Sequence, residues 1–164
     1  MPFFLKIFLQ TDNRKNENAD VYSAKNIFSA VTLNLKRDKM TKTVFSDKAP
    51  KPVGPYSQGM MAGKLLFISG QLPIDPGQGK IVASDIGAQT KRVMENIKAV
   101  LESADYSLKD IVSTTVYLSS MALFEEFNAE YAKFFDGEFP ARATVGCELK
   151  AGAHVEVSAI AFRS

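Results

Sequence analysis

Two strand-like runs near the carboxyl end of the chain constrain its fold most strongly, and each run carries one ionisable side chain. Residues 139–142 read Phe-Pro-Ala-Arg, and residues 155–161 read Val-Glu-Val-Ser-Ala-Ile-Ala. The proline ends the preceding helical pattern, and the apolar residues around Glu156 favour a strand. A guanidinium can hold a carboxylate through two parallel hydrogen bonds, and a carboxylate can hold or deprotonate a water. Arg142 and Glu156 are therefore candidate groups for chemistry on a small organic acid.

The composition is that of one ordinary globular domain. The chain has 164 residues, of which 46% are hydrophobic and 23% are charged, and its net charge is +2. This charge gives no electrostatic footprint for nucleic acid, which is not expected as a partner. The single cysteine cannot form an internal disulfide, which fits a reducing compartment. No apolar run approaches the ~18 residues that a membrane span requires, so no membrane partner is expected.

Residues 1–39 differ from the rest of the chain and are interpreted as an N-terminal extension. They contain two short apolar patches separated by a polar stretch, and they end in a basic run. The first patch is too short for a secretory signal, and the acidic residues disfavour a mitochondrial presequence. We interpret the extension as disordered or as sequence upstream of a true start at Met40. The alternatives are a docking segment and a targeting segment. A cytoplasmic location is expected, with the mitochondrion as the alternative if the extension is a targeting segment.

Residues 40–164 are predicted to form one domain with the element order β-β-β-α-β-α-β-β. Residues 49–56 are rich in proline and predict an extended loop, and residues 74–80 are typical of a turn. Ser84 or Asp85 is expected to cap the first helix. The order predicts an α+β fold in which both helices cover one face of a mixed sheet. Strands are expected over residues 42–46, 59–62, 64–71, 111–118, 143–149 and 154–162, and helices over residues 84–104 and 122–135.

The second face of the predicted sheet is left without a cover. In the predicted strands that contain Leu66 and Val116, apolar residues occur at both odd and even positions and therefore on both faces of the sheet. Both faces then require burial. Helices supply that burial on one face only. We therefore expect the chain to associate with copies of itself, with closed cyclic symmetry as the default.

Residues 40–164 closely resemble the RidA (YjgF) family of enamine and imine deaminases. The matching pieces occur in family order and at family spacing, and four pieces in register are far more specific than any one of them. The resemblance includes nothing before Met40, and it implies a chorismate-mutase-like homotrimer with active sites in the clefts between subunits. The pieces are Gly-Pro-Tyr-Ser-Gln at residues 54–58, Ile-Ser-Gly-Gln at residues 68–71, and the two runs at residues 139–142 and 155–161.

The resemblance also implies an activity, the hydrolysis of 2-iminobutanoate and 2-iminopropanoate to 2-oxo acids and ammonia without a cofactor. An iminium carbon is already electrophilic, so the site needs only to hold the carboxylate and to place a water. Arg142 is expected to hold the carboxylate, the alternative being a salt bridge within the sheet. Glu156 is expected to position or activate the water, the alternative being the solvent face of an edge strand.

Five further residues are candidates for the same pocket through the resemblance. Tyr56 is expected to line the cleft and to hydrogen-bond the substrate or its water, although it could instead pack against a neighbouring subunit. Ser69 and Gly70 are expected to line the pocket, and Gly70 could equally be a strand-end glycine. Asn128 is expected to approach the cleft, with a surface role as the alternative. Thr144 stands where many bacterial relatives have a cysteine, so a hydroxyl or a backbone N–H replaces any thiol contribution there.

Other chemistry is weakly supported. Cys147 is interpreted as a small buried hydrophobic residue that faces opposite to Thr144, and His154 as a surface residue at the start of a strand. One histidine and one cysteine disfavour a metal site, and none is expected.

Two rival functions remain from the sequence. One is a ribonuclease or translation inhibitor, an activity attributed to some relatives, and the near-neutral charge and single histidine disfavour it. The other is a non-catalytic ligand-binding or chaperone-like trimer. The presence of both Arg142 and Glu156 disfavours that role, because binding alone needs only the arginine.

Overall fold

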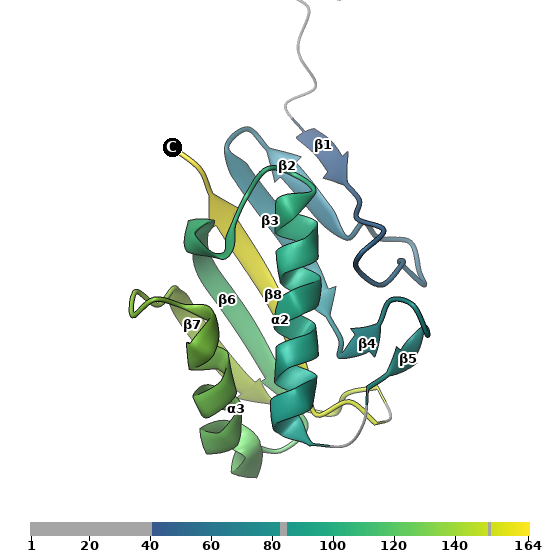
Figure 1. Cartoon of the computed structure of the whole chain (residues 1–164), viewed down its shortest axis with the longest axis vertical. Helices are drawn as coiled ribbons and strands as arrows, with labels where there is room; N and C mark the ends of the chain where they lie inside the picture. Colours follow the sequence, from purple (N-terminus) through teal and green to yellow (C-terminus); the bar gives the residue numbers. More distant parts are fainter. Residues whose placement is uncertain (1–40, 83–84, 151) are drawn as a thin grey trace, which may run out of the picture. The chain divides into compact units, whose positions relative to one another are not determined.

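The structure is a computed structural model that describes residues 41–82, 85–150 and 152–164. The predicted N-terminal extension, residues 1–39, lies outside the described residues. The described part contains a six-stranded sheet in the order β1-β2-β3-β8-β6-β7, with α2 and α3 side by side on one face (Figure 1). The predicted α+β fold, with both helices on one face of a mixed sheet, is therefore confirmed.

The sheet is antiparallel except at one edge. Only β7 runs parallel to its neighbour among the strands of the described part, because the connection from β6 passes through α3 and returns to the same end. The strands are β1 (Thr41–Val44), β2 (Gly59–Ala62), β3 (Leu65–Gln71), β6 (Ile111–Leu118), β7 (Ala141–Gly146) and β8 (Val155–Phe162).

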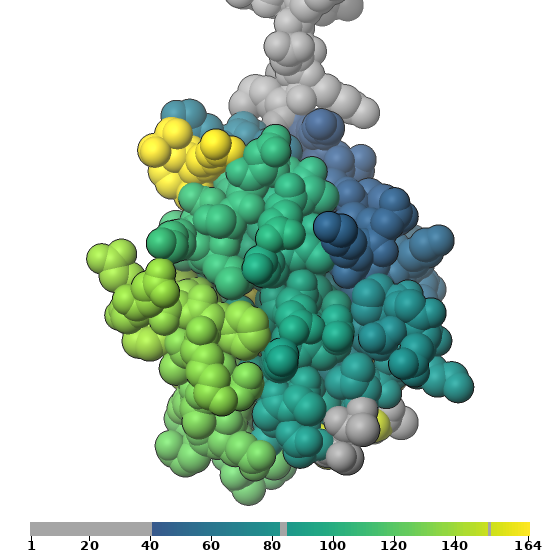
Figure 2. All heavy atoms as spheres, viewed as in Figure 1, coloured from purple at the N-terminus to yellow at the C-terminus, as the bar shows by residue number. Residues whose placement is uncertain are grey.

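Helix α2 (Ile86–Glu102) supplies most of the cover for the sheet. Asp85 caps it as predicted, because its side chain accepts a hydrogen bond of 2.7 Å from the backbone N–H of Ala88. The face of α2 turned to the sheet is fully buried. Figure 2, seen from the same side as Figure 1, shows the atoms of α2 and α3 covering the sheet. The helix contributes Val93, Met94, Ile97, Val100 and Leu101 to the core.

The second helical segment is divided where one helix was predicted. It consists of the 3-10 turn η2 (Met121–Leu123), the helix α3 (Phe124–Tyr131) and the 3-10 turn η3 (Ala132–Phe134). Phe127 and Tyr131 are buried and contribute to the core. The helical backbone stops at Phe135, which is extended, and Gly137 then takes a φ of 96° that favours glycine.

Several predicted element boundaries were wrong. Residues 74–80 form a small hairpin, β4 (Ile74–Asp75) with β5 (Lys80–Ile81), instead of a turn alone. A further 3-10 turn, η1 (Leu108–Asp110), leads into β6. Strand β1 ends at Val44 because the backbone N–H of Ser46 donates to Gln58 Oε1 at 2.6 Å. Strand β7 begins at Ala141 and ends at Gly146, because it pairs along β6 from Ser113 to Leu118.

The sheet face opposite the helices is open in the protomer. Strand pairing places Leu65 opposite Phe162 and Tyr117 opposite Val145, all on this face. The apolar side chains exposed there are Leu65, Phe67, Val145 and Phe162. The predicted uncovered apolar face is therefore present. A surface of this kind is typical of contacts between protein chains.

Candidate active site

Arg142 lies on β7 at the edge of the sheet, with its side chain on the helix side. Its Cα pairs with that of Thr114, a buried residue of β6, so the two side chains share a face. The guanidinium carbon Cζ lies 5.1 Å from the ring centroid of Tyr131, 5.5 Å from that of Phe127 and 5.7 Å from that of Phe124. These distances are those of cation–π contacts.

No carboxylate pairs with Arg142 among the residues that the structure describes. The alternative role for Arg142, a salt bridge within the sheet, is therefore not observed in the described part of the chain. The guanidinium carbon lies over the three aromatic rings, which are not carboxylates, so the N–H donors of Arg142 can serve a ligand. Arginine donors in this arrangement suit a carboxylate that binds with two parallel hydrogen bonds.

A cavity of about 380 Å³ lies beside Arg142. Asn128 and Arg142 both line it, so the structure brings these two predicted residues together. The side-chain oxygen of Asn128 is buried and has no hydrogen-bond partner within the described part of the chain. Thr144 follows Arg142 on the same face, since its Cα pairs with Val116. We call Asn128, Arg142 and Thr144 the Arg142 cluster.

Tyr131 lines the same cavity, although it is not among the site residues expected from the sequence. Its hydroxyl lies 3.0 Å from Oγ1 of Thr114, and either group can donate. Burial raises the pKa of the Tyr131 phenol, against the opposing effects of the Thr114 hydrogen bond and the Arg142 charge. The phenol is therefore protonated at neutral pH. Tyr131 follows Asn128 by three residues, and residues three apart lie on the same face of a helix. This spacing could have assigned Tyr131 to the site from the sequence.

Glu156 lies on the open face of the sheet, and its carboxylate packs directly against the Cα of Gly70. Its Cα pairs with that of Tyr117, whose side chain is on that face. A Cβ atom placed on Gly70 would meet Glu156 Oε1 at 1.9 Å, so only glycine leaves room for this carboxylate. The β3–β8 register is irregular between Ile68 and Gln71, where Gly70 lies. Burial raises the pKa of the Glu156 carboxyl above its usual 4.5.

Ser69 and Tyr56 lie beside the same end of β3. Ser69 Oγ donates to the carbonyl of Ser57 at 2.7 Å, and its backbone N–H donates to the carbonyl of Gln58 at 3.0 Å. These bonds hold the proline-rich loop against the strand. Tyr56 in that loop is 48% exposed, and its hydroxyl accepts a hydrogen bond of 3.4 Å from the Val53 N–H. We call Tyr56, Ser69, Gly70 and Glu156 the Glu156 cluster.

Gln58 organises this loop, and sequence reasoning assigned it no separate role. Its buried side-chain amide donates to the carbonyls of Ser46, Ala49 and Pro50 at 3.0, 3.2 and 2.8 Å. Three carbonyls held by one amide fix the loop without regular secondary structure. A glutamine directly after the proline-rich stretch was the available signal.

The protomer does not bring the two clusters together. The β6 residues that pair with Arg142 and Glu156 are Thr114 and Tyr117, which are three positions apart and so point to opposite faces. Strand β6 separates β7 from β8, which sets the two strand axes about 10 Å apart. Within one chain, Arg142 and Glu156 therefore belong to separate surfaces.

Cys147 and His154 belong to neither cluster. Cys147 follows the end of β7 and is half-buried in the protomer, which is less than the full burial predicted for it. The ring of His154 lies with Nδ1 3.2 Å from Ser119 Oγ, and its backbone N–H donates to Gln89 Oε1 at 2.7 Å. Both contacts stabilise the segment directly before β8. Among the described residues, no group of three or more His, Cys, Asp or Glu side chains could hold a metal.

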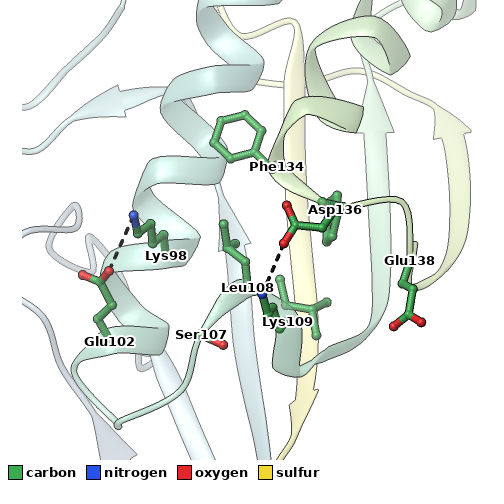
Figure 3. Close-up of a pocket in the computed structure, with 10 residues that line it drawn as sticks. Lys98, Glu102, Ser107, Leu108, Lys109, Phe134, Asp136 and Glu138 are labelled. Atoms are coloured by element: carbon green, nitrogen blue, oxygen red, sulfur yellow. Dashed lines mark ion pairs between the residues drawn. The ribbon is translucent and has the colours of Figure 1, made fainter.

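A larger cavity of about 520 Å³ lies on the helix side of the molecule, and different residues line it (Figure 3). Phe134 and Leu108 contribute to its apolar lining. Four of its five charged residues form two ion pairs, Lys98 with Glu102 at 3.7 Å and Lys109 with Asp136 at 3.2 Å. Since its lining contains none of the candidate residues, size alone does not make it the active site.

The fold and the two clusters define a class of protein, a small α+β domain that presents an arginine and a partly buried carboxylate from opposite faces of one sheet. The model of the family described as Endoribonuclease L-PSP matches residues 46–163. The chain belongs to this family, which includes the RidA and YjgF proteins, and the resemblance seen in the four motifs is confirmed. In the described part of the chain, every helix is too short or too polar to cross a membrane.

Individual relatives match almost along their whole length. A RutC family protein of Pyrococcus horikoshii is 49% identical over 125 residues, which cover 76% of this chain and 99% of the relative. A 2-iminobutanoate/2-iminopropanoate deaminase of Salmonella typhimurium is 41% identical over 128 residues, with coverage of 76% and 99%. The crystal structure of E. coli TdcF with bound serine has a TM-score of 0.72 and 36% identity, and the match covers 75% of this chain and 99% of that one.

Proposed function

We propose that this protein hydrolyses 2-iminobutanoate and 2-iminopropanoate to the corresponding 2-oxo acids and ammonia. The observation that carries the proposal is the Arg142 guanidinium, which lies over aromatic rings beside a cavity and has no carboxylate partner among the described residues. Two relatives support it. One is named as a deaminase of these two compounds, and another was crystallised with serine, a small amino acid that carries the same carboxylate.

Arg142 binds the substrate carboxylate in this proposal. Two parallel hydrogen bonds fix the position of the carboxylate and therefore the position of the adjacent C=N carbon. Phe139 and Pro140 line the same cavity and supply apolar contacts for a short alkyl chain. The cavity volume of about 380 Å³ suits a compact acid.

Glu156 supplies the base. Water attacks the iminium carbon, its oxygen forms the new C–O bond, and the carboxylate of Glu156 takes the released proton. Glu156 then gives that proton to the amino nitrogen, and as the C–N bond breaks the carboxylate takes the proton of the hydroxyl group. The C=O bond forms, and ammonia and the 2-oxo acid leave, with the last proton passing from Glu156 to the departing ammonia or to solvent. A carboxyl whose pKa is raised by burial is a better base than an ordinary glutamate. Tyr56 and Ser69, which the family resemblance assigns to the same pocket, hydrogen-bond the water in this proposal.

A complete site requires two copies of the chain. Because Arg142 and Glu156 lie on opposite faces, the Glu156 cluster of one subunit meets the Arg142 cluster of the next. Contacts between two different surfaces close into a ring, and we propose a homotrimer. The exposed apolar face of the sheet supports this association, since burial of Leu65, Phe67, Val145 and Phe162 is favourable.

A coupled assay tests the activity. A serine dehydratase generates 2-aminoacrylate, which tautomerises to 2-iminopropanoate, and pyruvate release is followed with and without the full-length protein. We expect the protein to accelerate pyruvate release and an Arg142→Ala variant to lose most of that acceleration. An unchanged rate with the parent protein would exclude the proposed activity on this substrate.

Ribonuclease activity is the competing proposal, because the family model is described as an endoribonuclease. The one histidine of the chain contacts Ser119 and Gln89 and has no second histidine to act with. A purified protein that cleaves RNA in an Arg142-dependent manner, and that has no effect on imine hydrolysis, would favour this alternative.

A further inference from the structure

Each of the three residues Arg142, Thr114 and Tyr131 interacts with the other two. Arg142 and Thr114 are direct partners across the β6–β7 pairing. Thr114 Oγ1 lies 3.0 Å from the Tyr131 hydroxyl, and the Tyr131 ring centroid lies 5.1 Å from Arg142 Cζ. The strand pair that carries the arginine therefore also anchors the ring that contacts its guanidinium.

We propose that Tyr131, anchored by Thr114, is the positioning residue that sets the plane of the Arg142 guanidinium and so determines the affinity for a substrate carboxylate. This inference rests on the proposed function, since it assumes that Arg142 binds the carboxylate. Tyr131 acts through Arg142 and does not need to contact the reacting atoms.

The need for positioning follows from the place of Arg142. It lies on an edge strand and is exposed, so its long side chain would sample many rotamers if nothing held it. Two parallel hydrogen bonds require the guanidinium and the carboxylate to share a plane, which makes disorder of the guanidinium costly for binding. An aromatic ring against the flat face restricts that plane and leaves the N–H edge free.

Tyr131 has a hydrogen-bond anchor that the other two rings of the set lack. Its ring centroid lies 5.2 Å from that of Phe127 and 4.9 Å from that of Phe135, and its hydroxyl bonds to Thr114. Among the three rings beside Arg142, it lies nearest to Cζ and is the only one with a hydroxyl. Phe124 is only partly buried and has no such anchor.

Direct ligand binding tests the assignment. The full-length protein is titrated by NMR with 2-oxobutanoate and with 2-butanone, in which a methyl group replaces the carboxylate. We expect Tyr131→Leu to weaken 2-oxobutanoate binding by about fivefold to twentyfold. Binding of 2-butanone should change by less than about twofold, because the ketone does not use the guanidinium. Tyr131→Phe restores the ring and should recover most of the lost affinity.

A double-mutant cycle distinguishes positioning from a general structural role. In an Arg142→Ala background, Tyr131→Leu should cause no further loss of 2-oxobutanoate binding, because the group that it positions is gone. Phe134→Leu is the matched control, an aromatic-to-leucine change next to the same helix without a contact to Arg142, and it should leave 2-oxobutanoate binding within about twofold. Equal losses for both ligands, or additive losses in the cycle, would overturn the proposal.

Two milder variants keep the test decisive if Tyr131→Leu does not fold. Thr114→Val and Tyr131→Phe each remove the anchoring hydrogen bond, and we expect small and equal losses that do not add in the double variant. Additive losses would again overturn the assignment. Because titration needs no turnover, a parent protein that binds 2-oxobutanoate through Arg142 and Tyr131 but does not accelerate imine hydrolysis would remove the proposed function and support this inference.

Discussion

Glu156 crosses Gly70 so closely that a Cβ atom on Gly70 would meet Glu156 Oε1 at 1.9 Å. No side chain other than hydrogen fits beneath the carboxylate at that point, and the atom that must move belongs to the proposed base. The glycine at the end of β3 is therefore required by Glu156 and not only by the bend of the strand.

Gly70→Ala is predicted to displace the carboxylate and to lower the rate of imine hydrolysis by about tenfold to a hundredfold, because a shift of about 1 Å moves the base out of reach of the water. The coupled assay measures the rate, and circular dichroism checks the fold. Gly54→Ala is the control, since a Cβ there meets the Tyr56 ring at an ordinary 3.6 Å. Full activity of Gly70→Ala would show that Glu156 is not the base.

Arg142→Lys keeps the positive charge but loses the planar pair of donors. We expect kcat/KM for 2-iminopropanoate to fall by about tenfold to a hundredfold while the fold stays intact, because a charge-assisted, two-point contact becomes a point charge. Arg92→Lys is the matched control, since Arg92 pairs with Glu95 at 3.1 Å on the surface of α2. Parent activity in Arg142→Lys would remove Arg142 from carboxylate binding.

The raised pKa of Glu156 predicts a dependence of activity on pH. Only the deprotonated carboxylate accepts a proton, so kcat/KM should fall as pH decreases through a value above the usual glutamate pKa of 4.5. Glu156→Gln should remove this acidic limb along with most of the activity. A pH profile with the same limb in Glu156→Gln would assign the limb to another group.

The same shift predicts how stability changes with pH. A carboxyl with a raised pKa binds its proton more tightly in the folded protein than in the unfolded chain. Between the two pKa values the folded state holds more protons, so the contribution of Glu156 to the free energy of unfolding falls as pH rises through that window. Denaturant unfolding at several pH values, compared with Glu156→Gln, measures this contribution. An identical pH dependence in the variant would exclude it.

Mixed assemblies test whether the site forms between subunits. Arg142→Ala and Glu156→Gln should each be inactive alone, and co-expression should restore activity. In a ring with random composition, about a quarter of the sites combine an intact Arg142 with an intact Glu156 of the neighbour. Recovery near a quarter of the parent activity is the expected result of the coupled assay. No recovery in assemblies shown to be mixed would place both residues in sites that one subunit completes.

Local patterns in the sequence were sufficient to predict most of the helices and strands. The β-branched run at Ile111–Leu118 forms β6 over the predicted residues, and Asp85 caps α2 as predicted. Strand and cap preferences depend on neighbouring residues alone, so they can be recognised before the fold is known. The four motifs, including the segments around Arg142 and Glu156, were likewise sufficient for the family.

Only the tertiary structure decided how the side chains of the candidate site are arranged. The start of β7 at Ala141 and its parallel register with β6 turn Arg142 toward Tyr131, while the pairing of β8 turns Glu156 to the other face over Gly70. A shift of one residue in either register would reverse the face of the side chain. Because register is set by contacts between distant segments, no local pattern could specify that these two residues lie on opposite faces of the sheet.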